Sequence, residues 1–165
     1  MTSSATVSVR LDAGNGTFGP KADYPTGASP KSLAAGDVNG DGKADLVVVR
    51  SNSFTVSLLV NDGDGTFAPK VDYPAGQNPN GAVFEDLDGD GKDELLVTDK
   101  NSNTVGVLVS NGDGTLAPKV DYPTGPAPGA VKAADLNGDG KPDVVVESAT
   151  GGVLSVLLNN GDGTL

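Results

Sequence analysis

The chain has 165 residues, a formal net charge of −11, and no cysteine, histidine or tryptophan. This acidity argues against nucleic acid or an anionic membrane surface as a partner, because phosphate recognition needs a basic patch. The chain lacks the commonest general acid–base group and any thiol nucleophile, so the composition argues against an enzyme. Few aromatic residues (4%), 24 glycines and 11 prolines predict many short strands around an aliphatic core.

Four strands are expected in chain order within residues 32–73, and we name them A to D. Strand A is Ser32–Gly36, which is built of small residues. Strand B is Asp45–Arg50, whose apolar run without alternation predicts burial on both faces. Strand C is Thr55–Val60. Strand D is Phe67–Tyr73, which ends just before a proline.

The same segments recur every 49 residues without gaps, which predicts one unit repeated along the chain. Residues 6–18 also align with residues 153–165, so the expected strand order is C-D, A-B-C-D, A-B-C-D, A-B-C. Four antiparallel strands in about 40–50 residues is the period of a β-propeller blade. We therefore predict an all-β chain forming a single, partial propeller domain, with repeats at about 28–76, 77–125 and 126–165. A solenoid is the alternative, although its repeats are usually shorter and parallel.

The segment between strands A and B carries one nine-residue pattern in every repeat: Asp37–Asp45, Asp86–Glu94 and Asp135–Asp143. Oxygen-bearing side chains stand at positions 1, 3, 5 and 9, with glycines at 4 and 6, and such a loop can wrap a hard cation. More than half of the 22 acidic residues lie in or beside these loops. Three divalent cations, at two charges each, would change the net charge from −11 to −5. We therefore interpret these acidic residues as metal ligands.

The acidic loops allow two other interpretations. An EF-hand needs a bidentate glutamate at position 12, but Val48, Val97 or Val146 stands there, so an EF-hand is rejected. Asx-rich turns without metal are the other interpretation. We prefer it for the C–D turns, Asp62–Gly65 and Asn111–Gly114, because they lack a position-9 acid and have the sequence of hairpin turns.

The Gly-Asp-Gly-Thr segment before Phe67-Ala-Pro69, together with residues 133–146, resembles the FG-GAP/VCBS repeat family. The resemblance covers nearly all of the chain from Thr6 onward. It implies an integrin-α-like propeller that binds about one Ca²⁺ per A–B loop. An all-oxygen ligand set favours Ca²⁺ over zinc or copper.

The ligands that the resemblance implies are the side chains at positions 1, 3, 5 and 9 and the backbone carbonyl of a lysine at position 7, whose side chain is expected to point away. They are Asp37, Asn39, Asp41, Lys43 and Asp45; Asp86, Asp88, Asp90, Lys92 and Glu94; and Asp135, Asn137, Asp139, Lys141 and Asp143. Glu94 replaces the usual aspartate, so loop two is expected to differ in affinity, and Asp93 could substitute for it.

These observations predict a non-catalytic, calcium-binding propeller that acts as a scaffold or assembly module. A carbohydrate-binding, lectin-like propeller and an extracellular adhesion module with an unknown protein ligand are the alternatives. Tyr24, Tyr73 and Tyr122 could stack on sugars, but their repeated position favours a contact between blades. Lys21, Lys70 and Lys119 are interpreted as solvated charges that discourage edge pairing.

Propellers close with four to eight blades, so three repeats predict self-association. A homodimer would give six blades and is preferred over a homotrimer with nine. Residues 6–27 of one chain would complete the last blade of its neighbour, and one copy of strand C, Thr6–Leu11, would be displaced.

The strict period indicates a designed or excised fragment of a bacterial extracellular or cell-surface protein. No signal peptide is expected, because no apolar segment follows a charged start. No apolar run approaches the roughly 18 residues of a membrane span.

Overall fold

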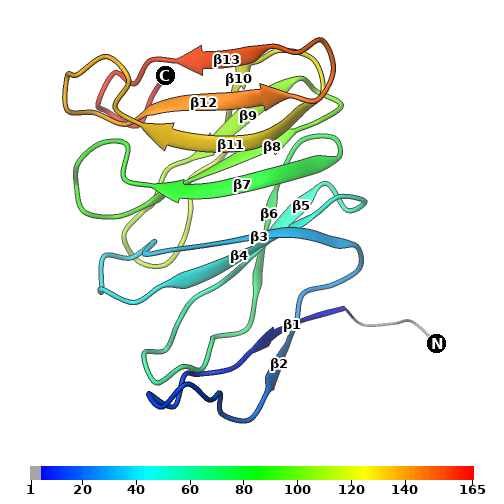
Figure 1. The fold of residues 1–165 in the computed structure, drawn as a ribbon, viewed down its shortest axis with the longest axis vertical. Coiled ribbons are helices and arrows are strands. Elements are labelled where there is room, and N and C mark those ends of the chain that lie inside the picture. The colour runs from blue at the N-terminus through cyan, green and yellow to red at the C-terminus, as the bar shows by residue number, and fades with distance from the viewer. Residues whose placement is uncertain (1–4) are drawn as a thin grey trace.

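The computed structural model describes residues 5–165, which contain thirteen β-strands and no helix. The strands form four antiparallel sheets stacked along the long axis of the molecule (Figure 1). No helix long and apolar enough to cross a membrane occurs within this range. The all-β class expected from the sequence is confirmed.

Two sheets are complete four-stranded blades in which neighbouring strands follow one another along the chain. Blade 1 comprises β3 (Pro30–Gly36), β4 (Asp45–Arg50), β5 (Thr55–Leu59) and β6 (Val71–Pro74). Blade 2 comprises β7 (Pro79–Glu85), β8 (Glu94–Asp99), β9 (Thr104–Leu108) and β10 (Val120–Pro123).

The other two sheets are partial blades. The N-terminal pair comprises β1 (Thr6–Val9) and β2 (Ala22–Pro25), and blade 3 comprises β11 (Pro128–Ala134), β12 (Asp143–Ser148) and β13 (Leu154–Leu157). The expected order C-D, A-B-C-D, A-B-C-D, A-B-C is therefore confirmed. Strand D is shorter than expected, because Phe67 makes only an isolated bridge with Asn61, and Pro69 that follows has no N–H to donate.

The first strands of successive blades, β3, β7 and β11, lie beside one another, and the remaining strands extend outward from them (Figure 1). This is the arrangement of propeller blades around an axis. All strand pairs within the sheets are antiparallel, so a solenoid of parallel strands is excluded for the described residues.

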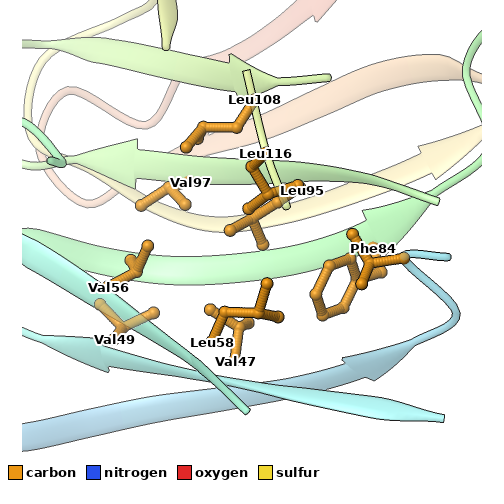
Figure 2. Close-up of a cluster of buried hydrophobic side chains, with 10 residues drawn as sticks. Val47, Val49, Val56, Leu58, Phe84, Leu95, Val97, Leu108 and Leu116 are labelled. Atoms are coloured by element: carbon orange, nitrogen blue, oxygen red, sulfur yellow. The ribbon is translucent and has the colours of Figure 1, made fainter. Parts of the chain in front are cut away.

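The core lies between the faces of adjacent blades and is almost entirely aliphatic. Figure 2 shows Val56 and Leu58 of blade 1 opposite Leu95 and Val97 of blade 2, and all four are buried. A second cluster joins blade 2 to blade 3 in the same way. Every residue of β8 is buried, as expected for a B strand covered on both faces.

Candidate calcium loops

The three A–B loops lie at the same end of their blades, on the left in Figure 1. They occupy residues 37–44, 86–93 and 135–142, and we call them loops one, two and three. In each, strand B begins with the position-9 acid. The repeat therefore places three equivalent acidic loops along one edge of the molecule.

The first aspartate of each loop is the acceptor around which the loop closes. Asp37 Oδ1 accepts a hydrogen bond from Gly40 N (2.8 Å), and its Oδ2 accepts one from Gly42 N (2.6 Å). Asp86 and Asp135 accept the equivalent bonds. Gly40 and Gly42 have φ values of 73° and 79°, which other residues rarely adopt, so glycine at these positions lets the amides face the carboxylate.

Positions 3 and 5 form Asx turns, in which a side-chain oxygen accepts the N–H two residues further on. Asn39 Oδ1 accepts from Asp41 N (3.1 Å), and Asp41 Oδ1 accepts from Lys43 N (3.0 Å). The other two loops repeat both bonds. Each side-chain oxygen has more than one lone pair, so these bonds leave capacity for a cation.

The acid at position 9 ties the A–B loop to the C–D turn of the same blade. Asp45 is fully buried; its Oδ2 accepts from Val38 N (3.0 Å) and its Oδ1 from Asn61 N (2.7 Å). Asp143 is equally buried and accepts the equivalent bonds at 3.1 and 2.9 Å. Glu94 accepts them at 2.8 and 3.4 Å, so its longer side chain reaches both donors but stretches the second bond.

Loop two brings three carboxylates together. Ligand oxygens of Asp86, Asp88 and Glu94 all lie within 4.8 Å of one another. Burial, together with the charges of Asp88 and Asp86, raises the pKa of Glu94 to about 7 against two backbone hydrogen bonds that lower it. Ca²⁺ takes oxygen ligands at roughly 2.4 Å, so atoms up to about 4.8 Å apart fit around one ion. The donor set of loop two therefore fits calcium.

The lysine at position 7 does not point away in loops one and two, as the sequence analysis expected. Lys43 Nζ lies 3.3 Å from Asp41 Oδ2, and Lys92 Nζ lies 2.5 Å from Asp90 Oδ2. In loop three, Lys141 Nζ instead donates to Asn160 O of the C–D turn (2.7 Å). In loops one and two the lysine thus pairs with the acid at position 5 of its own loop.

Asp93 does not substitute for Glu94 in this structure. Asp93 Oδ2 accepts from Asp37 N (2.7 Å), and Asp93 N donates to Asp37 O (2.9 Å). Asp93 thus connects loop two of blade 2 to loop one of blade 1. Burial raises the pKa of the Asp93 carboxyl, and the charges of Asp37 and Asp86 raise it further.

The C–D turns contribute residues that the sequence analysis assigned only to hairpin formation. Asn159 Nδ2 donates to Leu87 O in the loop of the preceding blade (2.8 Å), and Ser110 Oγ donates to Val38 O in the same way. These contacts join consecutive blades through residues that lie 72 positions apart in the sequence. The 49-residue spacing of Asn61, Ser110 and Asn159 was the available signal, but it does not reveal the partner.

The repeated tyrosines lie between blades. Tyr73 Oη accepts a hydrogen bond from Leu116 N (3.2 Å), and Tyr24 meets Phe67 edge-to-face at 5.3 Å. Equivalent pockets of about 260 and 430 Å³ open beside Tyr24 and Tyr73, and each also includes a lysine, Lys70 or Lys119. The tyrosines therefore contribute to packing and line a surface pocket as well.

The interpretation of Lys119 as a solvated edge charge is wrong. Its side chain is only 10% exposed, and Nζ lies 2.6 Å from Asp99 Oδ2 and 2.5 Å from Asp121 Oδ1. Asp99 is fully buried, so it can remain in the core only with a partner of opposite charge. Lys21 is about half exposed and matches the expectation better.

A model of the FG-GAP-like repeat matches the chain three times, over residues 1–48, 37–97 and 86–146. The second and third matches begin at the first aspartates of loops one and two. A comparison with curated proteins finds no match.

The solved structures that resemble this fold include the following three. One is a functionally unknown protein from Desulfotomaculum acetoxidans DSM 771, with a TM-score of 0.64 and 19% identity over 93% of this chain and 49% of that chain. Another is an Agrocybe aegerita lectin, described for specific recognition of non-reducing terminal N-acetylglucosamine, with a TM-score of 0.67 and 27% identity over 95% and 44%. The third is TcdB2-TccC3 without its hypervariable C-terminal region, with a TM-score of 0.53 and 20% identity over 89% and 7%. The chain spans less than half the length of each.

Proposed function

We propose, from the premise that this chain belongs to the FG-GAP-like repeat family, that it is a non-catalytic β-propeller module whose A–B loops bind calcium. Each loop would hold about one Ca²⁺ through the oxygens at positions 1, 3, 5 and 9 and the lysine carbonyl at position 7. The observation that carries the proposal is the cluster in loop two, where oxygens of Asp86, Asp88 and Glu94 lie within 4.8 Å.

Calcium in these loops would act mainly on stability. The buried position-9 acid joins the A–B loop to the C–D turn, so an ion at that carboxylate would also fix the turn. Burial raises the pKa values of Glu94 and Asp45, and the charges of the neighbouring carboxylates raise them further, so an ion beside these groups would relieve both effects. An ion that binds only the folded state stabilises it by mass action.

Thermal unfolding in saturating CaCl₂ and in excess EGTA tests the proposal. One site saturated at 100 times its Kd contributes about 2.7 kcal/mol. For a domain of this size that corresponds to about 5–10 °C in Tm per occupied site. We expect EGTA to lower Tm by at least that amount, and an unchanged Tm would contradict calcium binding.

A matched pair of variants locates the ions. Asp86→Asn removes a charge from loop two, and Asp113→Asn removes one from a C–D turn, where Asp113 accepts from Thr115 N (3.0 Å). Calorimetric titration should give about three Ca²⁺ for the wild type and for Asp113→Asn, but one fewer for Asp86→Asn. Equal stoichiometry in the two variants would exclude loop two as a site.

Carbohydrate binding is the second candidate function. It is favoured by the equivalent pockets between blades beside Tyr24 and Tyr73, and by the similarity to the Agrocybe aegerita lectin. Each pocket offers an aromatic ring, prolines and a lysine, a mixture of apolar wall and few polar groups that suits a small ligand. Titration with N-acetylglucosamine should then shift NMR signals of Tyr73 and Lys119, and no shift at millimolar sugar would remove this candidate.

A further inference from the structure

The outer face of β13 exposes apolar side chains that the equivalent strands bury. Leu154 and Val156 are 66% and 54% exposed, whereas Val56 and Leu58, two repeats earlier, are 0% and 1% exposed. Val56 and Leu58 are covered by the next blade along the chain. Within residues 5–165, no sheet covers the corresponding face of blade 3, and no strand pairs with the free edge of β13.

The opposite end of the molecule has a complementary gap. Leu33 of β3 is 60% exposed, whereas Val131, its equivalent in β11, is 4% exposed because blade 2 covers it. A cavity of about 310 Å³ lies beside Leu33 and is also lined by Val48 and by Val7 of β1. This face is where a preceding blade would pack, and among the described residues only the two-stranded N-terminal pair lies there (Figure 1).

Strand β1 stands where β13 of a complete preceding blade would lie. Leu154 and Val156 correspond to Val7 and Val9, three repeats earlier in the 49-residue period. Val7 lines the cavity, and its side chain is smaller than that of Leu154, the equivalent residue of β13. A β13 strand in this place would fill the cavity better than β1 does.

The pairing register supports this replacement. Strand β2 pairs with β1 as Ser8↔Asp23 and Val9↔Ala22, and the two complete blades pair C with D in the same register. Ser8 Oγ donates to Asp23 Oδ1 at 2.6 Å, and Ser57 in blade 1 makes the equivalent bond at 2.6 Å. Ser155 of β13 is the third serine in this series, so β13 carries a hydroxyl that can donate the same hydrogen bond to Asp23.

Blade 3 also contains a polar atom that a D strand would satisfy. Ser148 Oγ is buried and has no hydrogen-bond partner among the described residues. Asp99, the equivalent residue in blade 2, accepts a hydrogen bond from Lys119, which stands just before the D strand β10. Lys21, just before β2, is the equivalent of Lys119 in the repeat. If β2 were paired with β13, Lys21 would lie where it could donate a hydrogen bond to Ser148 Oγ.

We infer that β13 of one copy of this chain displaces β1 of a second copy and pairs with β2 there, so that two chains close a ring through two composite blades. The inference rests on the proposed propeller module. Strand β13 and the N-terminal pair lie at opposite ends of the molecule, so one chain cannot make this pairing with itself (Figure 1). Two copies supply six blades, within the usual range, and the chain covers 49% and 44% of two similar chains.

Disulfide trapping tests the register, because the chain has no cysteine of its own. In the composite blade Val156 should face Ala22, as Val107 faces Val120 in blade 2. Val156→Cys with Ala22→Cys should therefore form a covalent two-chain ring on oxidation. The control, Val156→Cys with Asp23→Cys, is one residue out of register and should not link, because adjacent residues face opposite sides of the sheet. Equal linking of both pairs would overturn the register.

A lock on β1 tests the exchange. Val9→Cys with Ala22→Cys joins two residues that already face each other within one chain. Oxidation should hold β1 in place and give a single-chain mass by light scattering, and reduction should restore the two-chain mass of the wild type. A two-chain mass in the oxidised variant would overturn the exchange. A wild-type mass of one or of three chains would overturn the two-chain ring and leave the edge of β13 to another occupant.

The calcium proposal is judged separately on the oxidised, locked variant. All three A–B loops remain in it, so its Tm should still fall in EGTA. A wild type that stays a single chain but whose Tm falls in EGTA would contradict only the exchange. A wild type that forms the two-chain ring but whose Tm is unchanged in EGTA would contradict only the calcium loops.

Discussion

The carboxylate at position 9 has a structural role in addition to its proposed role as a metal ligand. Asp45, Glu94 and Asp143 were predicted as metal ligands from the nine-residue pattern and the family resemblance. In the structure each also accepts backbone hydrogen bonds from two different loops. A buried backbone N–H that loses its acceptor is costly, so these acids should matter even without metal.

Replacing Asp143 with asparagine should therefore destabilise the calcium-free protein. One carboxylate oxygen becomes an NH₂ group that faces either Leu136 N or Asn159 N. Because both groups are then donors, one buried backbone N–H loses its acceptor. We expect a loss of about 1–3 kcal/mol in the free energy of unfolding, measured with urea in EGTA. Asp139→Asn, in an exposed position of the same loop, is the control and should change stability by less than about 0.5 kcal/mol. Equal effects would argue against the structural role.

The free energy of unfolding of the calcium-free protein should depend on pH in a way that shows the raised pKa of Glu94. The folded-state pKa is about 7, against an ordinary value of 4.5. Between these values the folded protein keeps a proton that the unfolded chain has lost, so the free energy of unfolding falls as pH rises through this window. Urea unfolding in EDTA from pH 5 to 8 should show a steeper fall for the wild type than for Glu94→Gln. Parallel curves would contradict the raised pKa.

Strand B shows how far the repeat predicts the structure. Its bounds, Asp45–Arg50, and its burial follow from an apolar run that only a doubly covered strand explains. The last position of that strand is Arg50, Asp99 or Ser148 in the three blades, and the sequence does not indicate their partners. Arg50 pairs with Asp72 of β6, and Asp99 pairs with Lys119 just before β10, so these partners depend on which charges the fold brings together. Ser148 Oγ has no hydrogen-bond partner among the described residues.

The buried pair Asp99–Lys119 should therefore behave as a unit. Lys119→Met leaves Asp99 buried without a cation, which costs about 3–5 kcal/mol when a buried pair is broken. Adding Asp99→Asn should recover most of that loss, because the isolated charge is gone. Urea unfolding of the single and double variants measures the coupling, and additive losses would show that the two side chains act independently. Lys132→Met, at an exposed position of β11, is the control and should have little effect.

Stacking of the blades could be predicted from the 49-residue period, because an exact repeat must bury the same face each time. The contacts that tie the blades together could not. Asp93 reaches loop one, and Asn159 reaches Leu87, through side chains whose partners lie 56 and 72 residues away. Such pairings depend on the rotation between blades, which a repeat length does not define. The acidic loops are thus brought into contact along one edge, where their charges add.

This charge makes the stability of the calcium-free protein depend on salt. With a net charge of −11, much of it in three neighbouring loops, the folded chain repels itself more strongly than the expanded unfolded chain does. Raising NaCl from 0.01 to 1 M shortens the screening length from about 30 to 3 Å, so Tm in EGTA should rise. In saturating calcium, three bound ions would reduce the charge to −5, so the same addition should raise Tm much less. Scanning calorimetry in both series measures the two slopes, with sucrose at matched osmolality as the uncharged control. Identical slopes with and without calcium would mean that the ions do not neutralise these loops.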